Sequence, residues 1–150
     1  MTEQEQIITD DSNLRKWRIE LPNLIDDLGL DPYERTLYVH YKRRCGANDG
    51  ECFETVRTTA STTRMSIGKV VKGRRSLAKR GLITATEGAP DRKGKKGTPV
   101  KIHIVDIWRL NFIYFSVDKR KRPEVTDWIV KQLSDWVEGI IGAERSPGER

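Results

Sequence analysis

The sequence of 150 residues predicts an α+β fold that is mainly helical, with a small antiparallel β-hairpin and an additional C-terminal amphipathic helix. Three observations support this prediction. Residues 56–83 contain two helical patterns separated by a tight turn, and residues 82–107 contain two runs typical of strands on either side of a segment rich in glycine and proline. From residue 123 onward, apolar side chains recur at helical spacing.

Composition divides the chain into five parts. We expect a disordered acidic lead-in at residues 1–13, because this segment carries four acidic residues and little apolar pattern. Residues 14–117 are predicted to form the domain, and residues 118–122 a basic linker. Residues 123–141 are predicted to form the amphipathic helix, and residues 142–150 a short tail.

The first long helix is predicted to start at residue 32 and to run to about Arg44. Asp31 supplies the N-cap, Pro32 the first helical position and Glu34 the partner of a capping box. Within this helix, His40 is interpreted as a core or boundary residue. A short strand is expected at residues 52–53, before the next helix.

The central pair of helices is predicted at residues 55–63 and 66–80. Ser66 is expected to cap the second helix, and Gly81 to end it in a left-handed conformation. The predicted core face of the second helix consists of Ile67, Val70, Val71, Leu77 and Ala78. The opposite face, predicted to meet solvent, consists of Lys69, Lys72, Gly73, Ser76 and Arg80.

Two strands, at residues 82–87 and 100–107, are predicted to form the hairpin. The segment between them, residues 88–99, is predicted to be a mobile basic loop. Its cations are Arg92, Lys93, Lys95 and Lys96. Such a loop suits contact with a phosphate backbone or a minor groove; a solvated hairpin loop is the alternative.

The C-terminal part contains two further apolar segments. We expect a short helix at residues 106–117 whose aromatic side chains belong to the core, followed by the four cations of residues 119–122. The last helix carries a wide apolar stripe that packs either on its own domain or on a partner. The candidate interface residues of this stripe are Trp128, Leu133, Trp136 and Ile140.

The net charge of +6 is unevenly distributed along the chain. Residues 40–122 hold 21 lysines and arginines against seven acidic residues, a net charge of +14. The flanking segments are both acidic. A polyanionic partner explains this concentration of charge most simply, because neutralising phosphates releases counterions and adds affinity.

Several kinds of function are not expected from this sequence. No apolar run is long enough for a membrane span, and the acidic N-terminus does not resemble a signal peptide. Cys45 and Cys52 lack the second close-spaced ligand pair of a zinc site, so we expect two reduced thiols, no metal and no cofactor. No nucleophile–base pair or carboxylate pair indicates an enzyme.

The central segment resembles the winged helix-turn-helix family of DNA-binding proteins. The residues that carry the resemblance are Ala60, Ser66, Val70, Leu77, Gly81, Leu82 and Ile83. One departure is Arg64 in the turn, where the family often has glycine; a left-handed conformation there costs about 1–2 kcal/mol. Residues 37–46 and 106–115 are also similar to helix-turn-helix proteins of phages, plasmids and integrated elements, including parts of replication initiators.

The resemblance implies a cytoplasmic protein that binds double-stranded DNA, on the nucleoid or on a mobile element, most simply as a sequence-specific transcriptional regulator. The implied contacts of the helix in the major groove and its flanking phosphates are Thr55, Arg57, Ser66, Gly68, Lys69, Lys72, Gly73 and Ser76. One alternative is an initiator or replisome organiser that binds a replication origin. Another is a winged-helix module that binds proteins, in which the C-terminal helix contacts a second copy or a replication or transcription protein.

Overall fold

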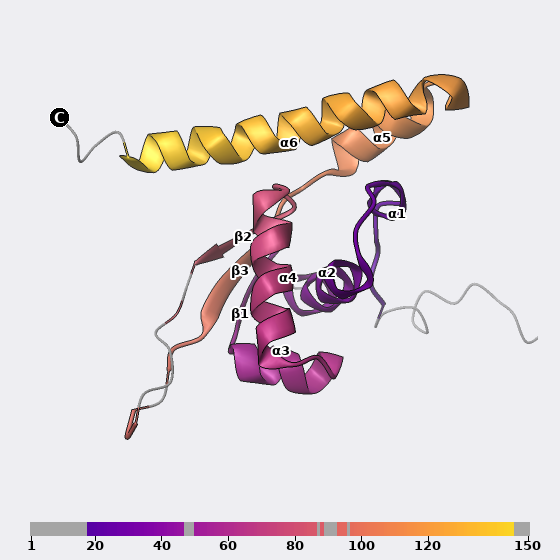
Figure 1. Ribbon diagram of the computed structural model, residues 1–150. Coiled ribbons are helices and arrows are strands. Elements are labelled where there is room, and N and C mark those ends of the chain that lie inside the picture. The colour runs from indigo at the N-terminus through magenta and orange to yellow at the C-terminus, as the bar shows by residue number, and fades with distance from the viewer. Residues whose placement is uncertain (1–17, 47–49, 87, 89–92, 96, 146–150) are drawn as a thin grey trace, which may run out of the picture.

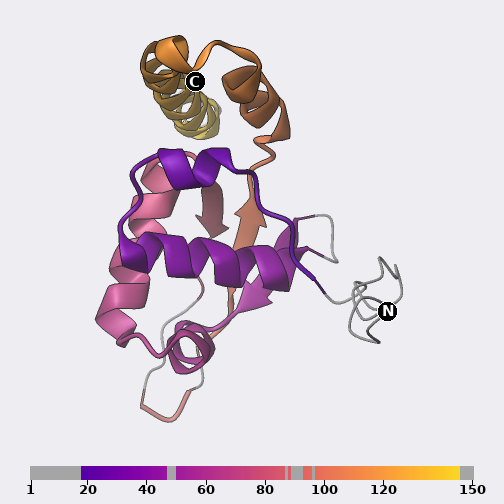
Figure 2. The same ribbon diagram turned by 90° about the vertical axis from the view of Figure 1, so that its right-hand side faces the viewer.

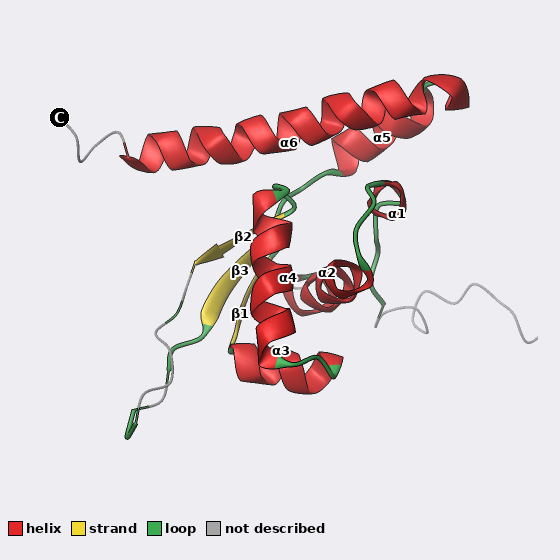
Figure 3. Ribbon diagram, viewed as in Figure 1, coloured by secondary structure: helices red, strands yellow, loops and turns green. Residues whose placement is uncertain are grey.

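The computed structural model describes residues 18–46, 50–86, 88, 93–95 and 97–145, with side chains up to residue 139. These residues form an α+β structure with six α-helices and one three-stranded antiparallel sheet (Figure 3). The α-helices are α1 (Leu24–Asp27), α2 (Pro32–Cys45), α3 (Val56–Thr63), α4 (Ile67–Lys79), α5 (Trp108–Ser116) and α6 (Arg122–Arg145). The strands are β1 (Glu51–Glu54), β2 (Ile83–Thr86) and β3 (Val100–Ile104), and a short 3₁₀ helix, η2 (Lys119–Lys121), precedes α6.

The sheet has the strand order β1-β3-β2, so the hairpin strands β2 and β3 pair and β1 is added on the other side of β3. Ile83 pairs with Ile104, and Cys52 with Ile102. The side chains of β1 and β3 alternate between more and less buried positions, and the sheet packs against α2 and α4. The predicted hairpin and the short strand before α3 are therefore confirmed; β2 and β3 are shorter than predicted, and β1 is longer.

Local capping fixes the ends of the helices as the sequence predicts. The Asp31 carboxylate accepts from the backbone N–H of Glu34 at 2.8 Å, and the Glu34 carboxylate accepts from the N–H of Asp31 at 3.1 Å. Ser66 caps α4 by accepting from the N–H of Lys69 at 3.2 Å. Gly81, with φ of +81°, follows the end of α4 in the left-handed region.

The turn between α3 and α4 contains a non-glycine residue in a left-handed conformation. Arg64 has φ of 59° and ψ of 31°, and its N–H donates to the carbonyl of Ala60. It is the one non-glycine residue with positive φ in the described part of the chain. The chain thus keeps the tight turn and tolerates the strain that a side chain adds there.

Helices α5 and α6 lie at one end of the molecule, and α3 lies at the opposite end (Figures 1 and 2). α6 passes across the C-terminal end of α4. Ile129 and Leu133 of α6 are buried there. The Asn111 side chain of α5 accepts from the N–H of Leu24 at 2.8 Å, and the Tyr114 hydroxyl donates to Asp27 at 2.8 Å. These contacts join α5 to α1.

Two predictions for this region were wrong. Trp108, Phe112 and Phe115 are exposed rather than part of the core, since only the opposite face of α5 packs on α1 and α6. The predicted linker at residues 118–122 joins α5 to α6 and contains the 3₁₀ turn η2, which the Asp118 carboxylate caps by accepting from the N–H of Arg120. The last helix extends to Arg145, past the predicted end at residue 141.

Some sequence predictions lie outside the described residues: the lead-in at residues 1–13, residues 146–150 of the tail, and the side chain of Ile140. None of the helices in the described part of the chain is both long and apolar enough to cross a lipid bilayer.

Candidate functional site

The outer face of α4 presents a row of small and cationic residues. The row consists of Gly68, Lys72, Arg75 and Lys79, all exposed, at the spacing i, i+4, i+7 and i+11. On a helix this spacing places side chains along one stripe. α4 lies in front of the sheet in Figure 1 and along one edge of the molecule in Figure 2, so one side of the helix is not covered by another element.

The opposite face of α4 is held by the core. Its buried residues are Val70, Gly73, Arg74 and Leu77. A side chain at Gly73 would meet Leu37 of α2, since a Cβ atom there would lie 2.5 Å from the Leu37 Cδ1 atom. Gly73 therefore lets α2 and α4 pack closely, and its predicted place on the exposed face was wrong.

The predicted core face of α4 was consequently rotated relative to the observed one. Ile67 is 53% exposed, and Val71 and Ala78 are only half-buried. Arg75 and Lys79 were not predicted as contact residues. They lie three and seven residues after Lys72, a spacing that places all three on one side of a helix. Gly73 and Arg74 belong to the buried face of α4, but neither is an apolar side chain that marks a core position in the sequence. The apolar pattern alone therefore predicted the wrong orientation of the buried face.

A buried carboxylate, Glu34, joins the start of α2 to the end of α4. Its Oε2 atom accepts from the Ser76 hydroxyl at 2.7 Å and from the Arg80 Nε at 2.6 Å. Burial raises the pKa of Glu34, but the hydrogen bonds from Arg80, Ser76 and Asp31 outweigh this effect and leave the pKa below its ordinary value. Ser76 and Arg80, predicted to face solvent, are therefore structural and fix the axis of α4.

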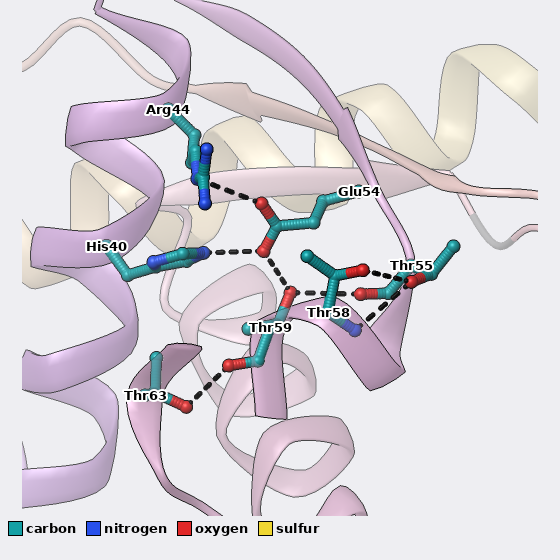
Figure 4. A network of polar contacts seen from close by, with 7 residues as sticks. All are labelled: His40, Arg44, Glu54, Thr55, Thr58, Thr59 and Thr63. Carbon is teal, nitrogen blue, oxygen red and sulfur yellow. Dashed lines mark hydrogen bonds and ion pairs between the residues drawn. The ribbon is translucent and has the colours of Figure 1, made fainter. Parts of the chain in front are cut away.

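A second buried carboxylate, Glu54 at the end of β1, positions α3 (Figure 4). Its Oε1 atom lies 2.5 Å from the His40 Nε2 and accepts from the Thr59 hydroxyl at 2.5 Å. The Arg44 guanidinium lies 3.2 Å from Oε2. Burial raises the pKa of Glu54, and the hydrogen bonds from His40 and Thr59, with the charges of His40 and Arg44, more than reverse the shift. The predicted core role of His40 is confirmed.

Helix α3 and the turn place further polar groups beside the start of α4. Thr55 caps α3, because its hydroxyl accepts from the N–H of Thr58 at 3.1 Å, so this predicted contact residue has a structural use (Figure 4). Arg57 is exposed on α3, and Arg64 is exposed in the turn. Ser66 is exposed at the N-cap of α4. These groups extend the polar surface beyond the outward row.

Lys69 lies beside the outward row rather than within it. Its ammonium group is 4.6 Å from the centre of the Tyr33 ring at the start of α2, a cation–π contact. Lys93 and Lys95 of the predicted basic loop are exposed. Arg92 and Lys96 of the same loop lie outside the described residues.

A second exposed surface is apolar and lies on α5. Trp108, Phe112 and Phe115 follow the spacing i, i+4 and i+7, and Phe112 is 73% exposed. Cations flank this aromatic row: the Lys42 ammonium lies 5.3 Å from the Trp108 ring centre, and the Arg122 guanidinium 5.0 Å from that of Phe115.

The candidate interface residues of α6 are not all available. Trp128 and Trp136 are exposed, whereas Leu133 is buried against the segment that follows α4. Of the two alternatives left open for this stripe, Leu133 follows the first, because α6 uses it to pack on its own domain.

Cys45 and Cys52 are free thiols, and both are buried. The described residues contain no group of three or more histidine, cysteine and acidic side chains that is able to hold a metal ion. Searches with the sequence and the structure returned no matching family model, no similar curated protein and no similar solved structure.

Proposed function

We propose that this protein binds double-stranded DNA, with α4 in the major groove, and that its α3-turn-α4 segment and β2–β3 hairpin form a winged helix-turn-helix. The observation that carries the proposal is the outward row of α4. Lys72, Arg75 and Lys79 are exposed together on one stripe. Among the described residues no acidic side chain pairs with them.

The dimensions of α4 support this proposal. Its 13 residues give a length of about 20 Å, and the major groove of B-DNA is wide enough to admit an α-helix. Gly68, near the start of α4, has no atom within 4 Å of the position of an added Cβ, so the backbone there is open to close approach. Arginine and lysine are the side chains that most often contact guanine edges and phosphates.

The two buried carboxylates support the proposal in a different way. Glu34 fixes α4 against α2, and Glu54 fixes α3 against α2 and β1. Glu34 therefore holds the C-terminal end of α4, and Glu54 holds α3, which the turn joins to the N-terminal end of α4. A preorganised surface loses less conformational entropy on binding. Lys93 and Lys95 would add contacts to the neighbouring backbone.

The experiment is a fluorescence-anisotropy titration with a random-sequence duplex and matched RNA over a series of salt concentrations. We expect micromolar binding to the duplex with a steep negative salt slope. Lys72→Ala combined with Arg75→Ala is expected to weaken binding at least tenfold. It should lower the magnitude of the slope by about 2, since each phosphate contact contributes about 0.9.

The matched control is Lys131→Ala, which removes an exposed lysine from α6, where its ammonium lies 3.8 Å from Asp135. This variant is expected to bind the duplex like the wild type. Equal affinity and slope for the double variant and the control would contradict the assignment of α4. Preference for RNA would contradict the duplex as target. Site selection would then separate one operator, expected for a regulator, from repeated sites, expected for an origin-binding protein.

The aromatic row of α5 favours a second candidate function, a module that binds a protein. Helices that insert into apolar grooves present anchors at i, i+4 and i+7, as Trp108, Phe112 and Phe115 do. This candidate predicts no duplex binding even at low salt. It also predicts a protein partner whose binding is lost in Phe112→Ala and kept in the α4 double variant.

A further inference from the structure

A cavity of about 290 Å³ lies where the ends of α1 and α4 meet α6. Its apolar wall is formed by Leu28, Leu82, Val130 and Leu133. Figure 1 shows α6 passing across the C-terminal end of α4 at this place. The cavity lies at the end of the outward row, and the proposed contacts with DNA leave its apolar part unused.

The rim of the cavity is polar and positively charged. Lys79 at the end of α4 and Arg80, its C-cap, line it together with Ser76 and Ser134. The charge of Arg80 is balanced by Glu34, whose Oε2 atom lies 2.6 Å from the Arg80 Nε. Lys79 has no acidic partner among the described residues. The cavity thus combines an apolar wall with one uncompensated cation.

The walls of the cavity are held in place by a close contact of backbone with backbone. Gly81 lies so near α6 that an added Cβ atom would be 2.6 Å from the Leu133 carbonyl oxygen. Leu82 and Leu133, which line the cavity, are also part of the buried core. The cavity therefore exists before a ligand enters, as most small-molecule sites do.

We propose that this cavity binds a small amphipathic carboxylate, with its apolar body against Leu28 and Val130 over the buried Leu82 and Leu133, and its carboxylate on Lys79. A cavity of about 150 Å³ holds benzene, so one of about 290 Å³ suits a body of about a dozen non-hydrogen atoms. Because Lys79 also belongs to the outward row, a bound carboxylate competes with phosphate for its charge. This second consequence rests on the proposed DNA binding.

The binding experiment is isothermal titration calorimetry of the full chain with decanoate, 1-decanol and decylamine. Saturable binding of one decanoate per chain is expected, with decanol at least fivefold weaker and decylamine weaker still. Absence of decanoate binding, or equal affinity for the three compounds, would overturn the proposal.

Two pairs of variants locate the site. Val130→Trp fills the cavity and is expected to abolish binding, whereas Gln132→Trp, which adds the same side chain to an exposed position of α6 outside the cavity, retains it. Lys79→Gln is expected to weaken the binding of decanoate at least fivefold without weakening the binding of decanol. Lys72→Gln is expected to leave both affinities unchanged. Circular dichroism spectra and melting temperatures identify any variant that fails to fold. Unchanged decanoate binding in folded Val130→Trp would refute the site.

A separate experiment tests the competition with DNA by repeating the anisotropy titration in the presence of saturating decanoate. The expected result is several-fold weaker duplex binding and a salt slope smaller by about 1, with no such effect in Lys79→Gln. Decanoate binding without any duplex binding would refute the proposed function and leave the cavity assignment intact. Duplex binding that decanoate does not alter would refute the competition for Lys79.

Discussion

Gly81→Ala is predicted to destabilise the fold strongly, because two independent costs meet at this position. The residue has φ of +81°, a conformation that L side chains rarely adopt. An added Cβ would also lie 2.6 Å from the carbonyl oxygen of Leu133 and 3.1 Å from its Cβ. A backbone carbonyl within α6 cannot rotate away, so the helix itself would have to move.

The magnitude follows from these two costs. The left-handed conformation destabilises the folded state by about 1–2 kcal/mol. Alanine also reduces the conformational entropy of the unfolded chain, which stabilises the fold by about 0.4–1 kcal/mol. Overpacking against a fixed backbone adds about 1–3 kcal/mol. We therefore expect Gly81→Ala to lower the free energy of unfolding by about 2–4 kcal/mol.

The matched control is Gly29→Ala, since Gly29 has φ of +72° and no atom within 4 Å of an added Cβ. It carries only the conformational cost, and we expect a loss of about 1 kcal/mol. Urea denaturation followed by circular dichroism measures both free energies of unfolding. Equal losses in the two variants would refute the close contact between the end of α4 and α6.

Three further predictions concern stability. Glu54→Gln should lower the free energy of unfolding at neutral pH by about 1.5–3 kcal/mol. Because the pKa of Glu54 is lower folded than unfolded, its contribution is fully present above about pH 4.5 and is lost as the pH falls through the folded pKa. The deficit of the variant in urea denaturation should therefore shrink in acid, and a constant deficit would argue against the ionised carboxylate. Tyr38→Phe should change the free energy of unfolding by less than about 1 kcal/mol in the same assay, since the buried hydroxyl has no hydrogen-bond partner among the described residues; a loss above about 2 kcal/mol would reveal one. Arg64→Gly should raise it by about 0.5–1 kcal/mol by relieving the left-handed strain, and a loss would show that the side chain stabilises the turn.

Features governed by neighbouring residues could be predicted from the sequence. The capping box at Asp31, the cap at Ser66 and the left-handed Gly81 depend on a few consecutive residues, and all three are present. The antiparallel hairpin likewise follows from two alternating runs and the segment between them. The winged-helix relationship and the binding of DNA stay predictions.

Features that depend on distant residues could not be predicted. Gly73 is buried because Leu37, on a different helix, occupies the space beside it. Ser76 faces inward because Glu34 accepts its hydroxyl. Similarly, the aromatic residues of a helix all belong to the core only when other elements cover every face of that helix. On α5, no other described element covers the face that carries Phe112.

The arrangement of the acidic residues explains why the basic charge of residues 40–122 remains on the surface. Four of the seven acidic residues in this segment are described, and each is engaged within the fold. Glu54 is buried in its network, Glu51 lies 3.5 Å from Lys101 across the strands, and Asp106 and Asp118 accept from backbone N–H groups of helix starts. None of them compensates the outward row of α4. Under the proposed function, this row is the surface that a polyanion laid along α4 would meet.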